Sequence, residues 1–105
     1  MSFKVNMEYT LKLLEEIINI PSPTGYCRNV MSHIDKVAHE CGYTVSRNNK
    51  GNRIIEIEGI DKGYCTGIPV HVDTLGAMVR SVNSEGTLKI TSIGVNMFST
   101  LDGEY

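Results

Sequence analysis

The sequence predicts an α/β fold in which two N-terminal helices pack on a small β-sheet and a β-hairpin follows. Three observations support this prediction. Apolar residues recur at helical spacing in two segments of the first 41 residues, the period changes toward two after Gly42, and breaker-rich turns separate the later extended segments. With 105 residues, 41% of them hydrophobic and 21% charged, the chain has the composition of a small globular domain or of part of a longer protein.

The first helix is predicted to begin after Asn6 and to end before Pro21. The apolar positions follow the 3.6-residue period, and polar residues cover the opposite side. Asn6 is a candidate N-cap, and the residue before proline is disfavoured in the helical region. The stripe consists of Met7, Leu11, Leu14 and Ile18, widened by Leu13 and Ile17.

A second helix is predicted from about Tyr26 to Cys41. Ser22 or Thr24 is expected to cap its start, and Gly42 supplies the left-handed residue that commonly ends a helix. His33 and His39 lie off its apolar stripe and are six residues apart. Two ligands on one helix face would be three or four residues apart, so we expect both imidazoles to be solvated.

Extended segments follow the second helix. Residues 43–47 and 53–58 are predicted to form a hairpin. Residues 64–72 are predicted to form a third strand. Because Pro69 has no N–H to donate, this strand either lies at a sheet edge there or begins after Pro69. Residues 77–82 and 87–93 form a second hairpin, with Gly86 available for a positive φ in its turn. Residues 94–105 are predicted to be a loop that enters a further strand. No predicted helix covers the second sheet face, so the chain is expected to be a segment of a longer protein or to pair with another chain.

His71 and Asp73 are the candidate site residues. They lie at the end of the apolar run 64–72, and residues i and i+2 of an extended chain project to the same side. An imidazole oriented by a neighbouring carboxylate is a common metal ligand. The same His-x-Asp pattern also occurs in solvated turns and around buried histidines, so it does not establish a metal site by itself.

The charge, the hydrophobic pattern and the cysteine content indicate which partners and which cellular compartment to expect. The formal net charge is -2, and Lys and Arg are scattered along the sequence, so nucleic acid is not an expected partner. No segment approaches ~18 consecutive apolar residues, and the N-terminus lacks a signal-peptide pattern, so we expect no membrane association and a cytoplasmic location. The three cysteines, Cys27, Cys41 and Cys65, are expected to be reduced.

Several segments together resemble the N-terminal part of one enzyme family. These are residues 20–25 (IPSPTG), 51–52 (GN), 71–79 (HVDTLGAMV), 86–90 (GTLKI), 93–94 (IG) and 101–105 (LDGEY). Their order and spacing are similar to those of the tetrahedral, or glutamyl, aminopeptidases, also labelled endoglucanase M, which are dinuclear metallo-exopeptidases. The similarity extends over nearly the whole chain and is therefore more specific than His-x-Asp alone.

The resemblance implies a role for each part of the chain. His71 would be the first ligand of two divalent metal ions, zinc or cobalt, and Asp73 would hold the geometry of the catalytic site. Residues 1–72 would belong to a catalytic α/β domain, and residues 73–105 would begin an inserted PDZ-like β domain that serves dimerisation. The implied activity is removal of N-terminal residues from peptides by a metal-activated water, in a homo-oligomer.

The resemblance also implies that the remaining metal ligands and the general-base Glu lie beyond residue 105. Stable zinc sites use three or four protein ligands, so the chain alone is expected to bind metal weakly at most and to be inactive. One alternative is a truncated, non-catalytic interaction module that pairs through an open sheet edge. Another is a carboxypeptidase-like zinc hydrolase that also uses His-x-Asp, although residues 74–79 followed by a hairpin favour the tetrahedral group.

Overall fold

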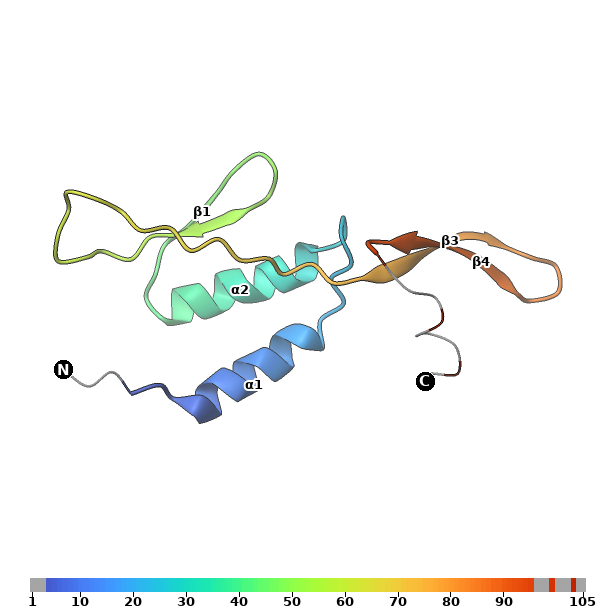
Figure 1. Cartoon of the computed structure of the whole chain (residues 1–105), viewed down its shortest axis with the longest axis horizontal. Helices are drawn as coiled ribbons and strands as arrows, with labels where there is room; N and C mark the ends of the chain where they lie inside the picture. Colours follow the sequence, from blue (N-terminus) through green and yellow to red (C-terminus); the bar gives the residue numbers. More distant parts are fainter. Residues whose placement is uncertain (1–3, 96–98, 100–102, 104–105) are drawn as a thin grey trace.

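The computed structural model describes residues 4–95, 99 and 103. In chain order these form α1 (Met7–Ile18), α2 (Arg28–Glu40), β1 (Val45–Arg47), β2 (Arg53–Ile55), β3 (Gly76–Val82) and β4 (Leu88–Ile93). Within the described residues, β1 pairs with β2 and β3 pairs with β4, which gives two separate antiparallel sheets (Figure 1). The predicted α/β class is confirmed at this level. The predicted loop at residues 94–105 lies mostly outside the described residues.

The chain is extended and buries little apolar surface. The radius of gyration of its Cα atoms is 18.6 Å, whereas a compact domain of this length has about 13 Å. Among the described residues, Val30 and Ala38 are the only buried hydrophobic side chains. Large parts of the apolar faces of the helices and sheets are therefore exposed to solvent. No helix in the described part of the chain has the length and apolar character needed to span a membrane.

α1 starts as the sequence predicts. Oδ1 of Asn6 accepts a hydrogen bond from the backbone N–H of Tyr9 at 3.1 Å, which satisfies one of the free donors of the first turn. Leu13 and Ile17 face an apolar hollow of about 330 Å³ between α1, α2 and the first hairpin. The other side chains that line this hollow are Ile34, Val37, Ala38, Cys41, Tyr43, Ile55 and Ile57.

One of the two helical histidines differs from the prediction. Nε2 of His33 lies 3.3 Å from a carboxylate oxygen of Glu16, and the imidazole is only 23% exposed. His33 therefore lies between α1 and α2 rather than in solvent. His39 is exposed, as predicted.

The predicted N-caps of α2 are wrong. The cap residue is Cys27, which makes no side-chain capping bond. The hydroxyl of Ser22 instead donates to the carbonyl oxygen of Val72 at 2.9 Å, and that of Thr24 donates to a carboxylate oxygen of Asp73 at 2.6 Å. Both hydroxyls thus serve a segment about fifty residues later in the chain. The helix ends before Gly42, whose φ of +84° fits the predicted left-handed stop.

β1 and β2 form the predicted first hairpin. Its turn is held by Asn48, whose Oδ1 accepts hydrogen bonds from the backbone N–H groups of Lys50 and Asn52, each at 3.0 Å. Gly51 has a φ of +87°, which an L side chain rarely adopts. β2 ends at Ile55 and is therefore shorter than the predicted segment 53–58.

The predicted third strand at residues 64–72 is wrong. The chain there runs past α2 without joining any strand of the described residues (Figure 1). Ile68 and Val70 are each 83% exposed, and Pro69 lacks the N–H that a ladder requires. A β-branched run adopts an extended form but becomes a strand only when a partner satisfies its backbone groups. The two helices therefore do not cover a three-stranded sheet.

β3 and β4 form the predicted second hairpin, with one irregularity that the sequence analysis missed. The register shifts between Val79 and Ser81, so Arg80 is an extra residue in a β-bulge. Residues that pair across the hairpin share a face, and so do residues i and i+2 of a strand. The bulge therefore brings four exposed apolar side chains onto one face: Val79, Val82, Leu88 and Ile90.

Gly76, the first residue of β3, lies against the N-terminal loop. A Cβ atom at this position would lie 2.7 Å from Cβ of Pro23, which is closer than two such carbons approach. We expect Gly76→Ala to weaken the contact between residues 22–24 and 72–76 by about 1.5 kcal/mol. The measurement is amide hydrogen exchange at Thr74, whose N–H donates to the carbonyl oxygen of Ser22 at 2.9 Å. Exchange should become about tenfold faster.

Gly67→Ala is the matched control for this substitution. A Cβ atom at Gly67 would meet no heavy atom within 4 Å, and its φ is not in the left-handed region. The control should leave exchange at Thr74 unchanged. Equal exchange rates in the Gly76→Ala variant and the parent would contradict the close contact.

Candidate functional site

Two segments far apart in the sequence meet at the candidate site. The backbone N–H of Thr74 donates to the carbonyl oxygen of Ser22 at 2.9 Å, and the buried hydroxyl of Ser22 donates back to Val72. Pro23 and Thr74 form an isolated parallel bridge. The breaker-rich loop after α1 thus fixes the end of the extended run and positions the side chains that flank Val72.

His71 and Asp73 project to the same side, as their i, i+2 spacing predicts. Nδ1 of His71 lies 3.1 Å from the main-chain oxygen of Asp73 and 3.3 Å from its carboxylate oxygen Oδ1. Two acceptors at Nδ1 favour the tautomer that carries its hydrogen there, which leaves the electron pair on Nε2. The imidazole is 84% exposed and the carboxylate 40% exposed, so both groups are accessible from solvent.

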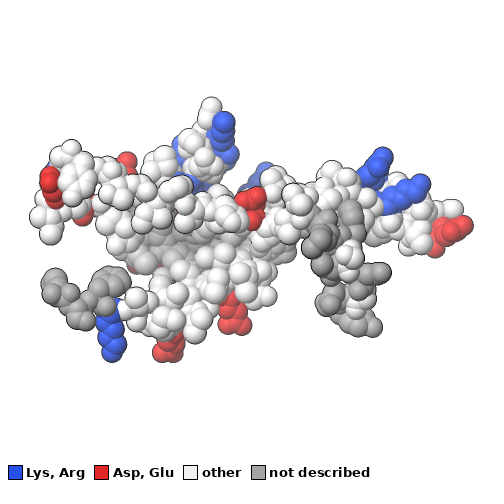
Figure 2. Space-filling model, viewed as in Figure 1, with Lys and Arg blue, Asp and Glu red and all other residues white. Residues whose placement is uncertain are grey.

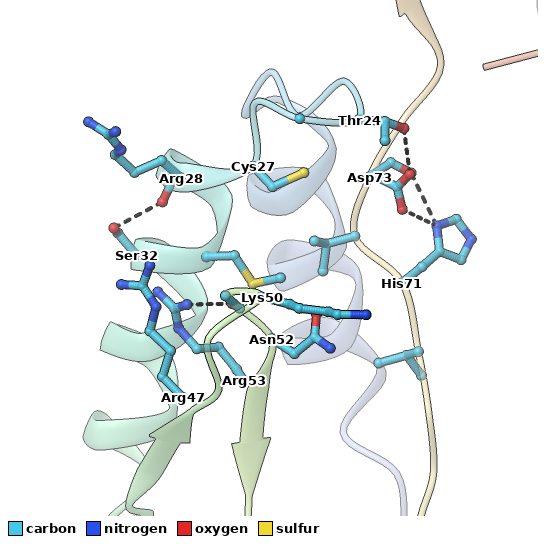
Figure 3. Close-up of a pocket in the computed structure, with 15 residues that line it drawn as sticks. Thr24, Cys27, Arg28, Ser32, Arg47, Lys50, Asn52, Arg53, His71 and Asp73 are labelled. Carbon is cyan, nitrogen blue, oxygen red and sulfur yellow. Dashed lines mark hydrogen bonds and ion pairs between the residues drawn. The ribbon is translucent and has the colours of Figure 1, made fainter. Parts of the chain in front are cut away.

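Thr24 completes this small cluster. Its hydroxyl donates to Oδ2 of Asp73 at 2.6 Å, while Oδ1 faces His71 (Figure 3). The hydrogen bond from Thr24, with smaller contributions from the backbone N–H and from His71, lowers the pKa of Asp73 below its ordinary value of 3.8. Asp73 is therefore ionised at neutral pH. The sequence predicts Thr24 as a possible helix cap and gives it no role beside Asp73.

The cluster borders a hollow of about 830 Å³ between α2, the β1–β2 turn and residues 70–73. This volume lies in the range of small-molecule sites. Figure 3 shows His71 and Asp73 on one side of the hollow and the side chains of Arg28 and Arg47 on the other. The hollow is therefore lined by groups from three parts of the chain.

Among the described residues that line this hollow, four side chains are cationic and Asp73 is the only acidic one. Figure 2 shows Lys and Arg side chains around the β1–β2 turn and the start of α2. Arg53 is neutralised by Asp35 through two hydrogen bonds of 2.7 and 2.8 Å. The other three cations form no ion pair with the described residues: Arg28, Arg47 and Lys50. Lys and Arg are scattered along the sequence, so the sequence does not predict this gathering.

The described side chains around His71 offer one candidate metal ligand rather than a complete set. In the described part of the chain, no group of three or more His, Cys, Asp or Glu side chains is placed to hold a metal ion. His71 offers one imidazole nitrogen, Nε2, with the ring oriented by Asp73. The nearby thiol of Cys27 instead points to the carbonyl oxygens of Ser22 and Pro23, at 3.6 and 3.8 Å. All three cysteines are free thiols.

Comparison with known proteins identifies the family. The model of the M42 glutamyl aminopeptidases matches residues 51–105, which include both His71 and Asp73. The chain is also 38% identical over 96 residues, or 91% of its length, to the Bacillus subtilis (strain 168) protein named "Putative aminopeptidase YhfE". This chain belongs to the M42 glutamyl aminopeptidase family. The family resemblance predicted from the sequence is thereby confirmed. The chain spans 28% of the length of this Bacillus relative.

Proposed function

We propose that this M42 chain supplies the first metal ligand of an aminopeptidase that removes N-terminal residues from peptides. The observation that carries the proposal is the geometry at His71, whose Nδ1 lies 3.1 and 3.3 Å from two oxygens of Asp73. Family membership supports a peptidase function, and the name of the Bacillus relative supports an aminopeptidase. Peptides are accordingly the proposed substrates.

Each residue of the cluster has a proposed role. His71 would bind a divalent metal ion, zinc or cobalt, through Nε2, and Asp73 would fix the imidazole ring and its tautomer. Thr24 keeps Asp73 ionised and in place. When bound, a pair of such ions supplies an acidified water and polarises the carbonyl of the scissile peptide bond. The exposed position of His71 leaves room for further ligands to approach.

The division of the chain into two domains is also a proposal. Residues 1–72 would belong to the catalytic domain, and residues 73–105 would begin an inserted β domain that serves homo-oligomer formation. The separation of the two sheets supports this boundary, because β3 and β4 share no ladder with β1 and β2. The enzyme is proposed to be cytoplasmic.

A chimaera tests the proposed function. In it, residues of this chain replace the matched segment of the Bacillus protein, and the unmodified Bacillus protein is the reference. We expect the chimaera to release N-terminal residues from short peptides, and a chelator to stop this release. The purified 105-residue chain should release none, because one imidazole cannot hold a stable metal site. An inactive chimaera beside an active reference would refute the proposal.

One observation favours a second candidate function, that of an interaction module. No third strand joins β3 and β4 in the described residues, and Val79, Val82, Leu88 and Ile90 expose an apolar face. Such a hairpin can add a strand from a partner. The chimaera separates the two functions, since a module without a catalytic role would not restore peptide hydrolysis.

A further inference from the structure

The hollow beside His71 concentrates positive charge in a chain whose formal net charge is -2. Arg28 comes from the first turn of α2, Arg47 from the end of β1, and Lys50 from the β1–β2 turn. The fold brings all three residues to the lining of one hollow, although a helix and a strand separate Arg28 from the other two in the sequence, and Figure 3 shows the Arg28 side chain directed away from the segment that carries His71. The one acidic residue of the lining, Asp73, is already engaged by Thr24 and His71.

The charges in the hollow are not balanced within the described part of the chain. Asp35 neutralises Arg53, but Arg28, Arg47 and Lys50 have no ion-pair partner among the described residues. Exposed cations without an ion-pair partner raise the local concentration of anions. An anionic group in the hollow would form charge-assisted hydrogen bonds with a cation that reaches it.

Lys50 is the cation that reaches furthest toward the candidate site. Figure 3 shows its side chain extending across the hollow toward the segment that carries His71, while Arg28 and Arg47 lie on the α2 side. The Asn48 side chain fixes the turn that presents Lys50 by accepting two backbone hydrogen bonds of 3.0 Å. The turn therefore fixes the backbone position from which the Lys50 side chain extends.

The geometry points to a carboxylate subsite: the hollow binds a carboxylate of the substrate peptide, with Lys50 as the principal contact. This inference rests on the proposed function for the identity of the ligand. A peptide whose first residue lies at His71 would extend into the hollow of about 830 Å³, and a short peptide would place its C-terminal carboxylate near the ammonium group of Lys50. An acidic side chain would supply the same chemical group.

This subsite is tested by NMR titration of the isotope-labelled 105-residue chain with peptides that have or lack a carboxylate. The probes are trialanine, its C-terminal amide, and a tripeptide amide with glutamate in the middle. We expect trialanine to shift the amide signals of Gly51 and Asn52 and to bind about fivefold more tightly than its amide. Binding of the glutamate peptide amide, lost in Lys50→Met, would also support the subsite and would assign the carboxylate to a side chain.

Substitutions at Lys50 complete the test. Lys50→Met should weaken trialanine about fivefold, and Lys50→Arg should restore the binding. The matched control is Lys36→Met, which removes an exposed lysine whose ammonium lies 3.7 Å from Glu40 on α2. Equal affinity for all three probes, or equal affinity of Lys50→Met and the parent, would overturn the inference. The assay contains no metal and measures no turnover, so its outcome is independent of whether the chimaera hydrolyses peptides.

Discussion

His71→Ala is expected to lower kcat/KM of the chimaera by about a thousandfold, because the substitution removes the proposed metal ligand. In the described part of the chain, no group of three or more His, Cys, Asp or Glu side chains is placed to take over the metal. The initial rate of amino-acid release from a short peptide, measured at several zinc and cobalt concentrations, gives the loss. Excess metal should restore only part of the activity.

Two further variants define the origin of this loss. Asp73→Asn keeps the shape of the side chain but removes its charge, and we expect a 10- to 100-fold loss, as for residues that orient a ligand. His39→Ala, at an exposed position on α2, is the matched control and should leave activity unchanged. If His71→Ala retained most of its activity while the chimaera remained metal-dependent, the assignment of His71 as a ligand would be refuted.

The features that the sequence predicted well depend on nearby residues. α1 starts after Asn6, whose capping bond spans three residues, and α2 stops at Gly42, whose φ is positive. The shared orientation of His71 and Asp73 follows from a spacing of two residues in an extended chain. In each case the residues that determine the structure lie within one helical turn or one strand repeat.

The features that it predicted badly depend on distant partners. Ser22 and Thr24 have the right chemistry for helix caps, but Val72 and Asp73 offer competing acceptors about fifty residues away. Residues 64–72 have the composition of a strand, yet the described chain provides no partner strand for them. The hollow lined by Arg28, Arg47 and Lys50 could not be predicted either, because Arg28 and the β1–β2 turn come to line one hollow only when the chain folds.

The ion pair between Arg53 and Asp35 is expected to make the largest single contribution to the attachment of β1–β2 to α2. Nε and Nη2 of Arg53 lie 2.7 and 2.8 Å from the two carboxylate oxygens, and Nη1 donates to the carbonyl oxygen of Gly51 at 2.6 Å. The guanidinium is 12% exposed and the carboxylate 29% exposed. Arg53→Met would leave Asp35 partly buried and unpaired, at a cost of about 2 kcal/mol.

Hydrogen exchange of the β1 and β2 amides measures this cost. Exchange should become about thirtyfold faster in Arg53→Met, whereas the amides of β3 and β4 should be unaffected. Arg80→Met removes an exposed arginine from β3 that forms no ion pair with the described residues, and it is the matched control. Equal exchange in Arg53→Met and the parent would show that the ion pair contributes nothing.

The effect of Arg53→Met should also depend on pH in a predictable direction. The hydrogen bond from Arg53 is the main cause that lowers the pKa of Asp35 in the folded chain below its ordinary value of 3.8. A lowered folded-state pKa gives stability that is fully present above the ordinary, unfolded-state pKa and is lost as the pH falls through the folded-state value. The difference in exchange between the parent and Arg53→Met should therefore be constant from neutral pH down to about 5 and should shrink below about 4. A difference that grew on acidification would mean that protonated Asp35, rather than its carboxylate, is the partner of Arg53.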